Sequence, residues 1–314
     1  TDADIDATSV TLTAPRDVRV GGARQPAGET NCQAWPVEVG ESGLRELTVH
    51  YQLRGIAWSV SYDLTFDAAS RKAWLVGALH LSNDSRLPLR GARVELCPQP
   101  VGVVDQGQPE ANSVGAYAVL DPCTLEPGWQ RRVRFLHVPD LPARVLYRAD
   151  WESSRQEVRR YLHVDLRQIP APGPLPTGHL EVYELVDGRR VPVTRGTLAQ
   201  AVDRDTEIFL GAEPDIVFER TLLRWRKTDV QFDRIGRVSG YDIHEDLRDT
   251  LRNRLPFPVD IELIERVPGV WEFSGLVPPT HREANEMRWE FHLPPDGRAE
   301  IHFTITRRVG SRAG

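Results

Sequence analysis

One candidate for chemistry is the run of polar and ionisable side chains at Tyr241–Asp246 (YDIHED). A histidine beside a carboxylate can act as a general acid and base, and a hydrolase could use Asp242 and Glu245 in this way. On a β-strand, however, Asp242, His244 and Asp246 share one face, as polar residues do on the wet face of a sheet. We therefore expect a structural role and keep a hydrolase with an unrecognised carboxylate site as an alternative.

Histidines and cysteines are the other candidates for a site. Six of the nine histidines alternate with apolar residues: His50, His80, His137, His163, His292 and His302. His292 and His302 flank one predicted turn and could be neighbours, but no third metal ligand is evident, so solvent-facing strand positions explain them better. Cys97 and Cys123 could form a disulfide that closes a loop of roughly 25 residues, although spacing equally allows buried free thiols. No metal ligand is assigned.

Motif searches give no enzyme signature. The chain has no G-x-S-x-G elbow, no G-x-G-x-x-G and no Walker A loop, which argues against an α/β-hydrolase triad and against the common nucleotide sites. No catalytic residue, cofactor or cofactor-binding residue is assigned, and the pattern favours a protein that is not an enzyme.

Eight tryptophans offer a further possibility. An exposed pair of indole rings could stack on sugars, whereas buried rings would dominate a β-sheet core. Seven of them lie in or beside predicted strands, which favours the core: Trp58, Trp74, Trp129, Trp151, Trp225, Trp271 and Trp289. A carbohydrate-binding surface remains an alternative.

Bulk properties exclude several classes of partner. The net charge is -6 and the isoelectric point about 5.9, which argues against a nucleic-acid-binding protein. No run of about 18 apolar residues is present, so we expect no transmembrane segment. Because the chain begins with Thr1, we expect that a preceding part was removed and that any targeting signal went with it; localisation stays open.

Period-two alternation is the main structural signal, and it predicts antiparallel strands with one apolar face. The clearest examples are Leu47–Leu53, Trp58–Phe66, Ala143–Trp151, Met287–Leu293 and Ala299–Ile305. Asp187-Gly188 and Pro294–Arg298 have the composition of hairpin turns. Convincing helical periodicity is absent, with short helical turns expected at most at Leu198–Asp205 and Thr280–Glu286.

These patterns predict an all-β protein with very little helix, built from antiparallel, immunoglobulin-like β-sandwich modules, of which we expect two. The expected division is an N-terminal extension (1–44), a first module (45–168), a proline-rich linker (169–178) and a second module (179–314). The linker is assigned because four of its prolines alternate with other residues, which favours a stiff extended segment. The rival interpretation is a long loop within one continuous sandwich.

A faint internal repeat accompanies this division. Leu81–Leu96 and Leu251–Leu263 both read as the end of a strand, an Asn turn, a Leu-Pro pair and a second strand. Asparagine often ends a strand by binding its own backbone, so the echo is explained by a shared turn or by two similar modules.

Several of these segments resemble one known family. The stretches Ala57–Leu64, Leu79–Ser85 and Ala92–Leu96 are similar to the core of the conserved C-terminal domain of mucoidy-inhibitor-A-like proteins, a domain of unknown function. Three later segments extend the resemblance over most of residues 45–306: Leu141–Tyr147, Asn253–Ile264 and Pro268–Trp271. The family's N-terminal domain and coiled coil are not visible here. The resemblance implies an exported bacterial protein and carries over no catalytic residue.

The sequence therefore leads to a non-enzymatic β-sandwich module that contacts another protein or a second copy of itself. Paired strands without a catalytic constellation motivate this hypothesis, because sandwiches have edge strands that a partner can extend. A cell-envelope carbohydrate-binding module and the hydrolase described above are the two alternatives.

Overall fold

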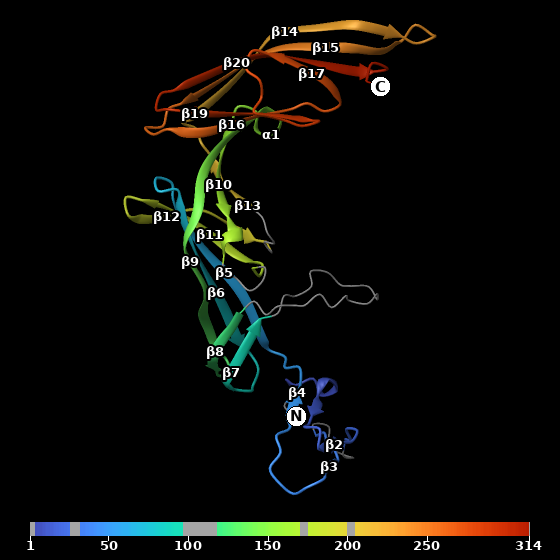
Figure 1. Cartoon of the computed structure of the whole chain (residues 1–314), viewed down its shortest axis with the longest axis vertical. Coiled ribbons are helices and arrows are strands. Elements are labelled where there is room, and N and C mark those ends of the chain that lie inside the picture. Colours follow the sequence, from blue (N-terminus) through green and yellow to red (C-terminus); the bar gives the residue numbers. More distant parts are fainter. Residues whose placement is uncertain (1–3, 26–31, 97–117, 170–174, 200–204, 314) are drawn as a thin grey trace.

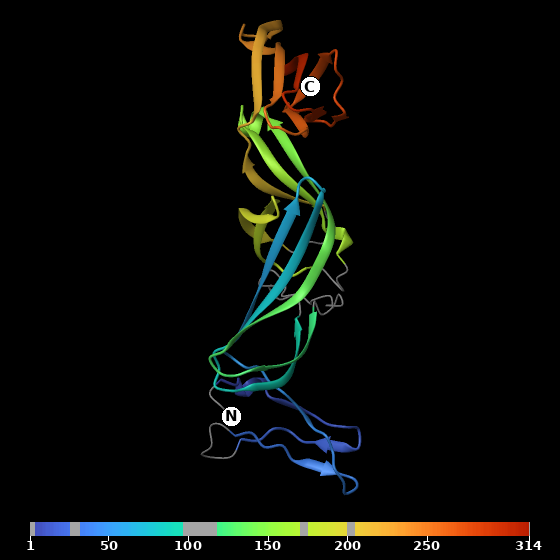
Figure 2. The same ribbon diagram turned by 90° about the vertical axis from the view of Figure 1, so that its left-hand side faces the viewer.

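The computed structural model describes residues 4–25, 32–96, 118–169, 175–199 and 205–313. Strands make up 66% of the structure and helices 4%, which confirms the all-β prediction. The molecule is elongated, with the N-terminal elements at one end and the hairpin of β14 and β15 at the other (Figures 1 and 2). Cys97 lies outside the described residues; Cys123 is a buried free cysteine, which fits the free-thiol alternative rather than the disulfide.

A first set of five strands occupies the middle of the molecule: β5 (Ile56–Asp67), β6 (Lys72–Asn83), β7 (Leu89–Leu96), β8 (Ala118–Leu125) and β9 (Gln130–Asp150). Antiparallel pairing orders three of these strands as β5-β6-β9, while β7 and β8 pair with each other. The predicted alternation holds here, because Tyr62, Leu64 and Phe66 on β5 are all buried in one hydrophobic cluster.

A second set repeats this arrangement: β14 (Ile216–Phe232), β15 (Val238–Asn253), β16 (Val259–Arg266), β19 (Glu286–Leu293) and β20 (Arg298–Gly310). The order β14-β15-β20 corresponds to β5-β6-β9, and the pair β16-β19 corresponds to β7-β8. Two short strands, β17 (Val270–Gly275) and β18 (His281–Arg282), lie at the edges of the second set and have no counterpart among the described residues of the first.

Each set contains the same kind of junction, built on a fully buried asparagine. The Asn83 amide donates to the carbonyl oxygens of Leu87 and Leu125 at 2.8 and 2.9 Å. The Asn253 amide likewise donates to the carbonyl oxygens of Phe257, Leu293 and Pro294. In each set the side chain therefore ties the end of one strand to the following turn and to the strand of the opposite sheet. The sequence echo thus reflects the same junction and the same order of strand pairing.

Strand β9 joins the two sets, because its 21 residues continue from one hydrophobic cluster into the other. Its first half pairs with β6, and its second half pairs with β10 (Val158–Asp165) and, in parallel, with β16. Asp150 then ends β9 and caps α1 (Trp151–Ser154) by accepting from the backbone N–H groups of Glu152 and Ser153. Strand β13 (Asp205–Ala212) extends the sheet beyond β10.

The two hydrophobic clusters do not separate at residues 169–178, where the boundary between the modules was expected. Beyond η2 (Leu166–Gln168), the chain returns to the first cluster as β11 (Gly178–Val186) and β12 (Arg189–Leu198). Strand β11 pairs in parallel with β5, and the Asp187-Gly188 turn joins β11 to β12 as a hairpin, as predicted. Residues 178–198 therefore pack with the first strand set.

Three local predictions were wrong. The last two long strands, β19 and β20, do not form a hairpin, since β19 pairs with β16 and β18 whereas β20 pairs with β15 and β17. Residues 281–282 within the helical turn expected at Thr280–Glu286 are the strand β18. In the strand predicted at Leu47–Leu53, Val49 and Tyr51 are exposed. The helical turn expected at Leu198–Asp205 falls mostly outside the described residues.

The segment before β5 consists of short elements: η1 (Ala7–Ser9), β1 (Thr11–Thr13), β2 (Val18–Val20), β3 (Val37–Val39) and β4 (Thr48–His50). They form two separate two-stranded sheets, β1 with β4 and β2 with β3. Strand β4 thus belongs with the N-terminal elements rather than with the first strand set.

Candidate functional site

The run at Tyr241–Asp246 lies on β15, where it does not form a converging site. Asp242 is on the outer face, bound by the Arg312 guanidinium at 2.7 Å, whose hydrogen bond lowers the pKa of Asp242 below its ordinary value. Glu245 points to the opposite face and pairs with Arg307 at 2.7 Å. Because these two carboxylates lie on opposite faces of the sheet and each is bound to an arginine, they give an acid–base mechanism no support.

The histidines are held in ordinary polar contacts. His244 lies between the hydroxyl groups of Thr228 and Thr306, at 2.8 and 3.0 Å. His292 contacts Asp260 on its own sheet, whereas His302 contacts Glu300 on the other sheet, so the two are not neighbours across a hairpin. Within the residues that the structure describes, no group of three or more His, Cys, Asp or Glu side chains could hold a metal ion.

The tryptophans divide between core and surface. Trp289 is 2% exposed and packs against Phe303 and Phe273 with ring centroids 5.5 and 5.8 Å apart. Trp129 and Trp225 are 62% and 51% exposed, but they belong to different strand sets. No two tryptophan rings contact each other in the described part of the chain.

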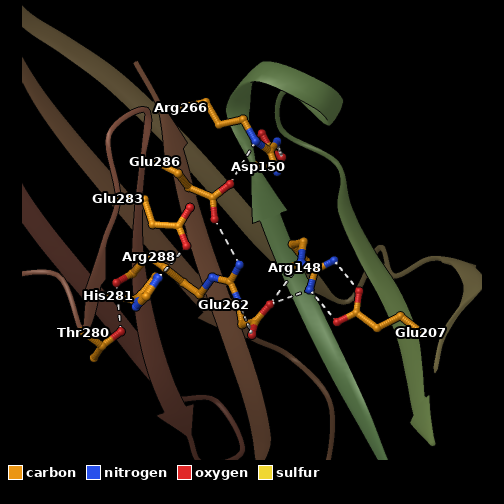
Figure 3. A network of polar contacts seen from close by, with 10 residues as sticks. All are labelled: Arg148, Asp150, Glu207, Glu262, Arg266, Thr280, His281, Glu283, Glu286 and Arg288. Atoms are coloured by element: carbon orange, nitrogen blue, oxygen red, sulfur yellow. Dashed lines mark hydrogen bonds and ion pairs between the residues drawn. The ribbon is translucent and has the colours of Figure 1, made fainter. Parts of the chain in front are cut away.

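A network of ion pairs crosses the outer face of the sheet where β9, β13, β16 and β19 meet (Figure 3). Arg148 binds Glu262 at 2.7 Å and Glu207 through both terminal nitrogens at 3.0 Å, and its guanidinium stacks on Tyr161. Arg288 also contacts Glu262, at 3.4 Å. Each of these charges is paired, so the network holds strands from both sets together.

A second charged cluster lies between the two sheets of the second strand set. The Arg220 guanidinium binds Asp249 at 2.6 Å, also binds Glu265, and lies 5.2 Å from the ring centroid of Trp151. Burial raises the pKa of Glu265 above its ordinary value, although Arg220 acts in the opposite direction. Trp151, Arg220 and Glu265 line a cleft of about 480 Å³ that reaches Leu222. The cleft marks where the covering sheet stops while β14 and β15 continue.

Beyond this cleft, β14 becomes an exposed edge strand. It is 17 residues long, and among the described residues it pairs only with β15. Leu222, Leu223 and Trp225 are 52%, 48% and 51% exposed. Arg224 and Arg226 are also exposed and make no ion pair with any described residue. In Figure 1 no strand lies beyond β14 on its outer side.

The equivalent edge in the first strand set is covered. Ile56 pairs with Asn83 in one set and Ile216 with Asn253 in the other, so counting from the two asparagines makes Tyr62 equivalent to Leu222. β14 then contains one extra residue at a bulge, Leu223, which makes Leu64 equivalent to Trp225. In the first set β11 pairs along residues 61–66, and Tyr62 and Leu64 are 0% and 1% exposed.

Sequence reasoning found the repeated Asn turn, without its burial or its contacts to the opposite sheet, and missed the open edge. The sequence placed Trp225 in or beside a strand, but the segment 221–228 (TLLRWRKT) has no clean alternation because the bulge interrupts it, so the sequence did not show which of its side chains are exposed. No helix in the described part of the chain combines the length and apolar character needed to cross a membrane.

Comparison with known proteins adds no identity: no family model matches the chain, and no curated protein matches it. The resemblance to mucoidy-inhibitor-A-like proteins therefore stays a prediction.

Proposed function

We propose that this protein is a non-enzymatic interaction module that accepts an extended strand of a partner protein along the outer edge of β14. The observation that carries the proposal is the contrast between two equivalent edges: β5 is completed by β11, while β14 is left open. An unpaired edge presents a row of backbone N–H and C=O groups that a second strand can satisfy.

Side-chain exposure supports the same surface. Leu222 and Trp225 occupy the face of the sheet whose other positions, such as Phe218 and Leu251, are buried against the opposite sheet. About half of each of these two side chains remains in contact with solvent. A partner strand beside β14 would cover part of this apolar area with little rearrangement of the chain. The ion-pair networks, by contrast, offer no unpaired charge to a ligand.

Crosslinking in the native host tests the proposal with a matched pair of variants. Trp225→Ala and Trp129→Ala each remove one exposed indole, the first on the open edge and the second in the first strand set. We expect a photoreactive amino acid at position 223 to crosslink one partner protein, and Trp225→Ala to reduce the crosslink about tenfold while Trp129→Ala leaves it unchanged. Equal loss in both variants, or no crosslink at all, would contradict the proposal.

A further inference from the structure

We infer that the strand received by β14 is parallel to it and carries apolar side chains beside Leu222 and Trp225 and acidic side chains beside the cations of β14. This inference rests on the proposed function and specifies the partner. It is drawn from the first strand set, in which the chain fills the equivalent edge with its own β11 and so shows the orientation, register and side-chain pattern that such an edge accepts.

Orientation follows from the pairing of β11 with β5. Residues His179–Glu184 run parallel to Ser61–Phe66. Each residue of the first segment lies opposite one residue of the second, in order and without a register shift. The residues of β14 equivalent to Ser61–Phe66 are Thr221, Leu222, Arg224, Trp225, Arg226 and Lys227. A strand that completes β14 in the same way therefore runs parallel along the segment whose side chains are exposed.

The apolar half of the pattern follows from the inner face. Leu180 and Val182 of β11 lie beside Tyr62 and Leu64 and are 4% and 1% exposed. At the second edge the corresponding neighbours are Leu222 and Trp225, on the same inner face of their sheet. Apolar side chains at these two positions of the partner would bury both residues.

The acidic half follows from a change in charge between the two edges. On the outer face Asp63 and Thr65 of β5 are replaced by Arg224 and Arg226 in β14, and Phe66 on the inner face is replaced by Lys227. Neither arginine is engaged by the rest of the described chain, because Asp242 is bound by Arg312 and Asp246 accepts from Thr304. Carboxylates opposite these cations would form cross-strand pairs of opposite charge.

The same charges disfavour a second copy of β14 as the occupant. Antiparallel pairing of two copies about residues 224–228 places Arg226 opposite Arg226 on one face, and parallel pairing in register places every arginine opposite itself. Like charges directly opposite each other are destabilising, and cations on an edge strand are a common device against self-association. Bulges at Leu223 and at Asp229–Val230 flank this segment.

A synthetic peptide with the sequence of residues 178–186 (GHLEVYELV) is the probe, because in the β11 register it places glutamates beside Arg224 and Lys227. Added to the isotope-labelled full chain, it should shift the backbone amide signals of residues 221–228. A spin label at its N-terminus should broaden the signal of Thr221, and one at its C-terminus that of Thr228. The opposite broadening pattern would show antiparallel binding and overturn the inference, while leaving the proposed function intact.

Exchanging the charges of the peptide and of β14 tests the acidic part of the pattern. Replacing both glutamates of the peptide by lysines should weaken binding roughly tenfold, as expected for two cross-strand pairs turned from attractive to repulsive. The Arg224→Glu, Lys227→Glu double variant should restore binding of the lysine peptide and reject the original. Equal affinity of both peptides for both proteins would overturn the acidic pattern alone. If neither peptide shifts residues 221–228, or if a single-stranded oligothymidylate shifts them more strongly, the inference and the strand-accepting function both fail.

Discussion

The two strand sets contain the same asparagine junction and the same order of strand pairing. The equivalent edge strand, however, is covered in the first set and open in the second. Tyr62 and Leu64 on β5 are 0% and 1% exposed where β11 lies beside them. Leu222 and Trp225 on β14 are 52% and 51% exposed where no described strand lies beside β14 and the covering sheet has ended. The difference shows that the arrangement itself leaves an edge to be filled, and that in this chain one edge is filled internally and the other is left accessible.

A second difference lies in how charge is used. In the second set the inner face carries Arg220 where β5 has Val60, and the guanidinium is matched by Asp249 and Glu265. Placing a charged group between two sheets is costly unless it is paired, so this end of the core gains little stability from burial alone. The second core therefore depends more heavily on its aromatic cluster around Trp289.

The largest effect is expected from the centre of that cluster. Trp289→Ala should lower the free energy of unfolding by about 3–5 kcal/mol, because it removes a large buried side chain that packs on Phe273 and Phe303. Arg288→Ala, at the neighbouring position but facing the polar network, should cost about 1 kcal/mol or less. Denaturant melts measure both. Similar losses would mean that β19 is not half-buried.

Breaking the shared junction should give matched, intermediate effects. Asn83→Ala and Asn253→Ala should each cost about 2–4 kcal/mol, since each leaves buried carbonyl oxygens without a donor. A cost at one asparagine less than a third of that at the other would show that the two junctions are not equivalent.

The sequence predicted local features better than pairing partners. Alternation identified Tyr62, Leu64 and Trp289 as buried because a strand with one wet face imposes a period of two whatever its neighbour is. Alternation says nothing about which sheet a strand joins. Pro294–Arg298 has hairpin composition, but the Asn253 amide donates to the Pro294 carbonyl oxygen and holds this turn in the junction, and the chain crosses to the other sheet. The open edge of β14 was hidden for the same reason, since its exposure depends on the absence of a distant strand.

A smaller, pH-dependent effect is expected at Glu265. Because burial raises the folded-state pKa of Glu265, the folded protein binds more protons than the unfolded chain between the two pKa values. Stability contributed by this carboxyl is therefore lost as the pH rises through that window, by about 1.4 kcal/mol per unit of pKa difference. Glu265→Gln should gain stability relative to the parent chain as the pH rises above about 4.5, the ordinary pKa of a glutamate. Urea melts of both proteins, repeated at several pH values, measure this difference.

The smallest effect is expected at the open edge, and it tests the comparison most directly. Trp225→Ala should change the free energy of unfolding of the isolated chain by less than about 1 kcal/mol, because half of the indole is already in water. Leu64→Ala, at the equivalent position of the covered edge, should cost about 2–5 kcal/mol although its side chain is smaller. A large cost at Trp225 would mean that the edge is already covered in solution, by the chain or by a second copy. A small cost at both positions would mean that β11 does not bury the edge of β5. β11 could then no longer serve as the template for the strand that β14 accepts.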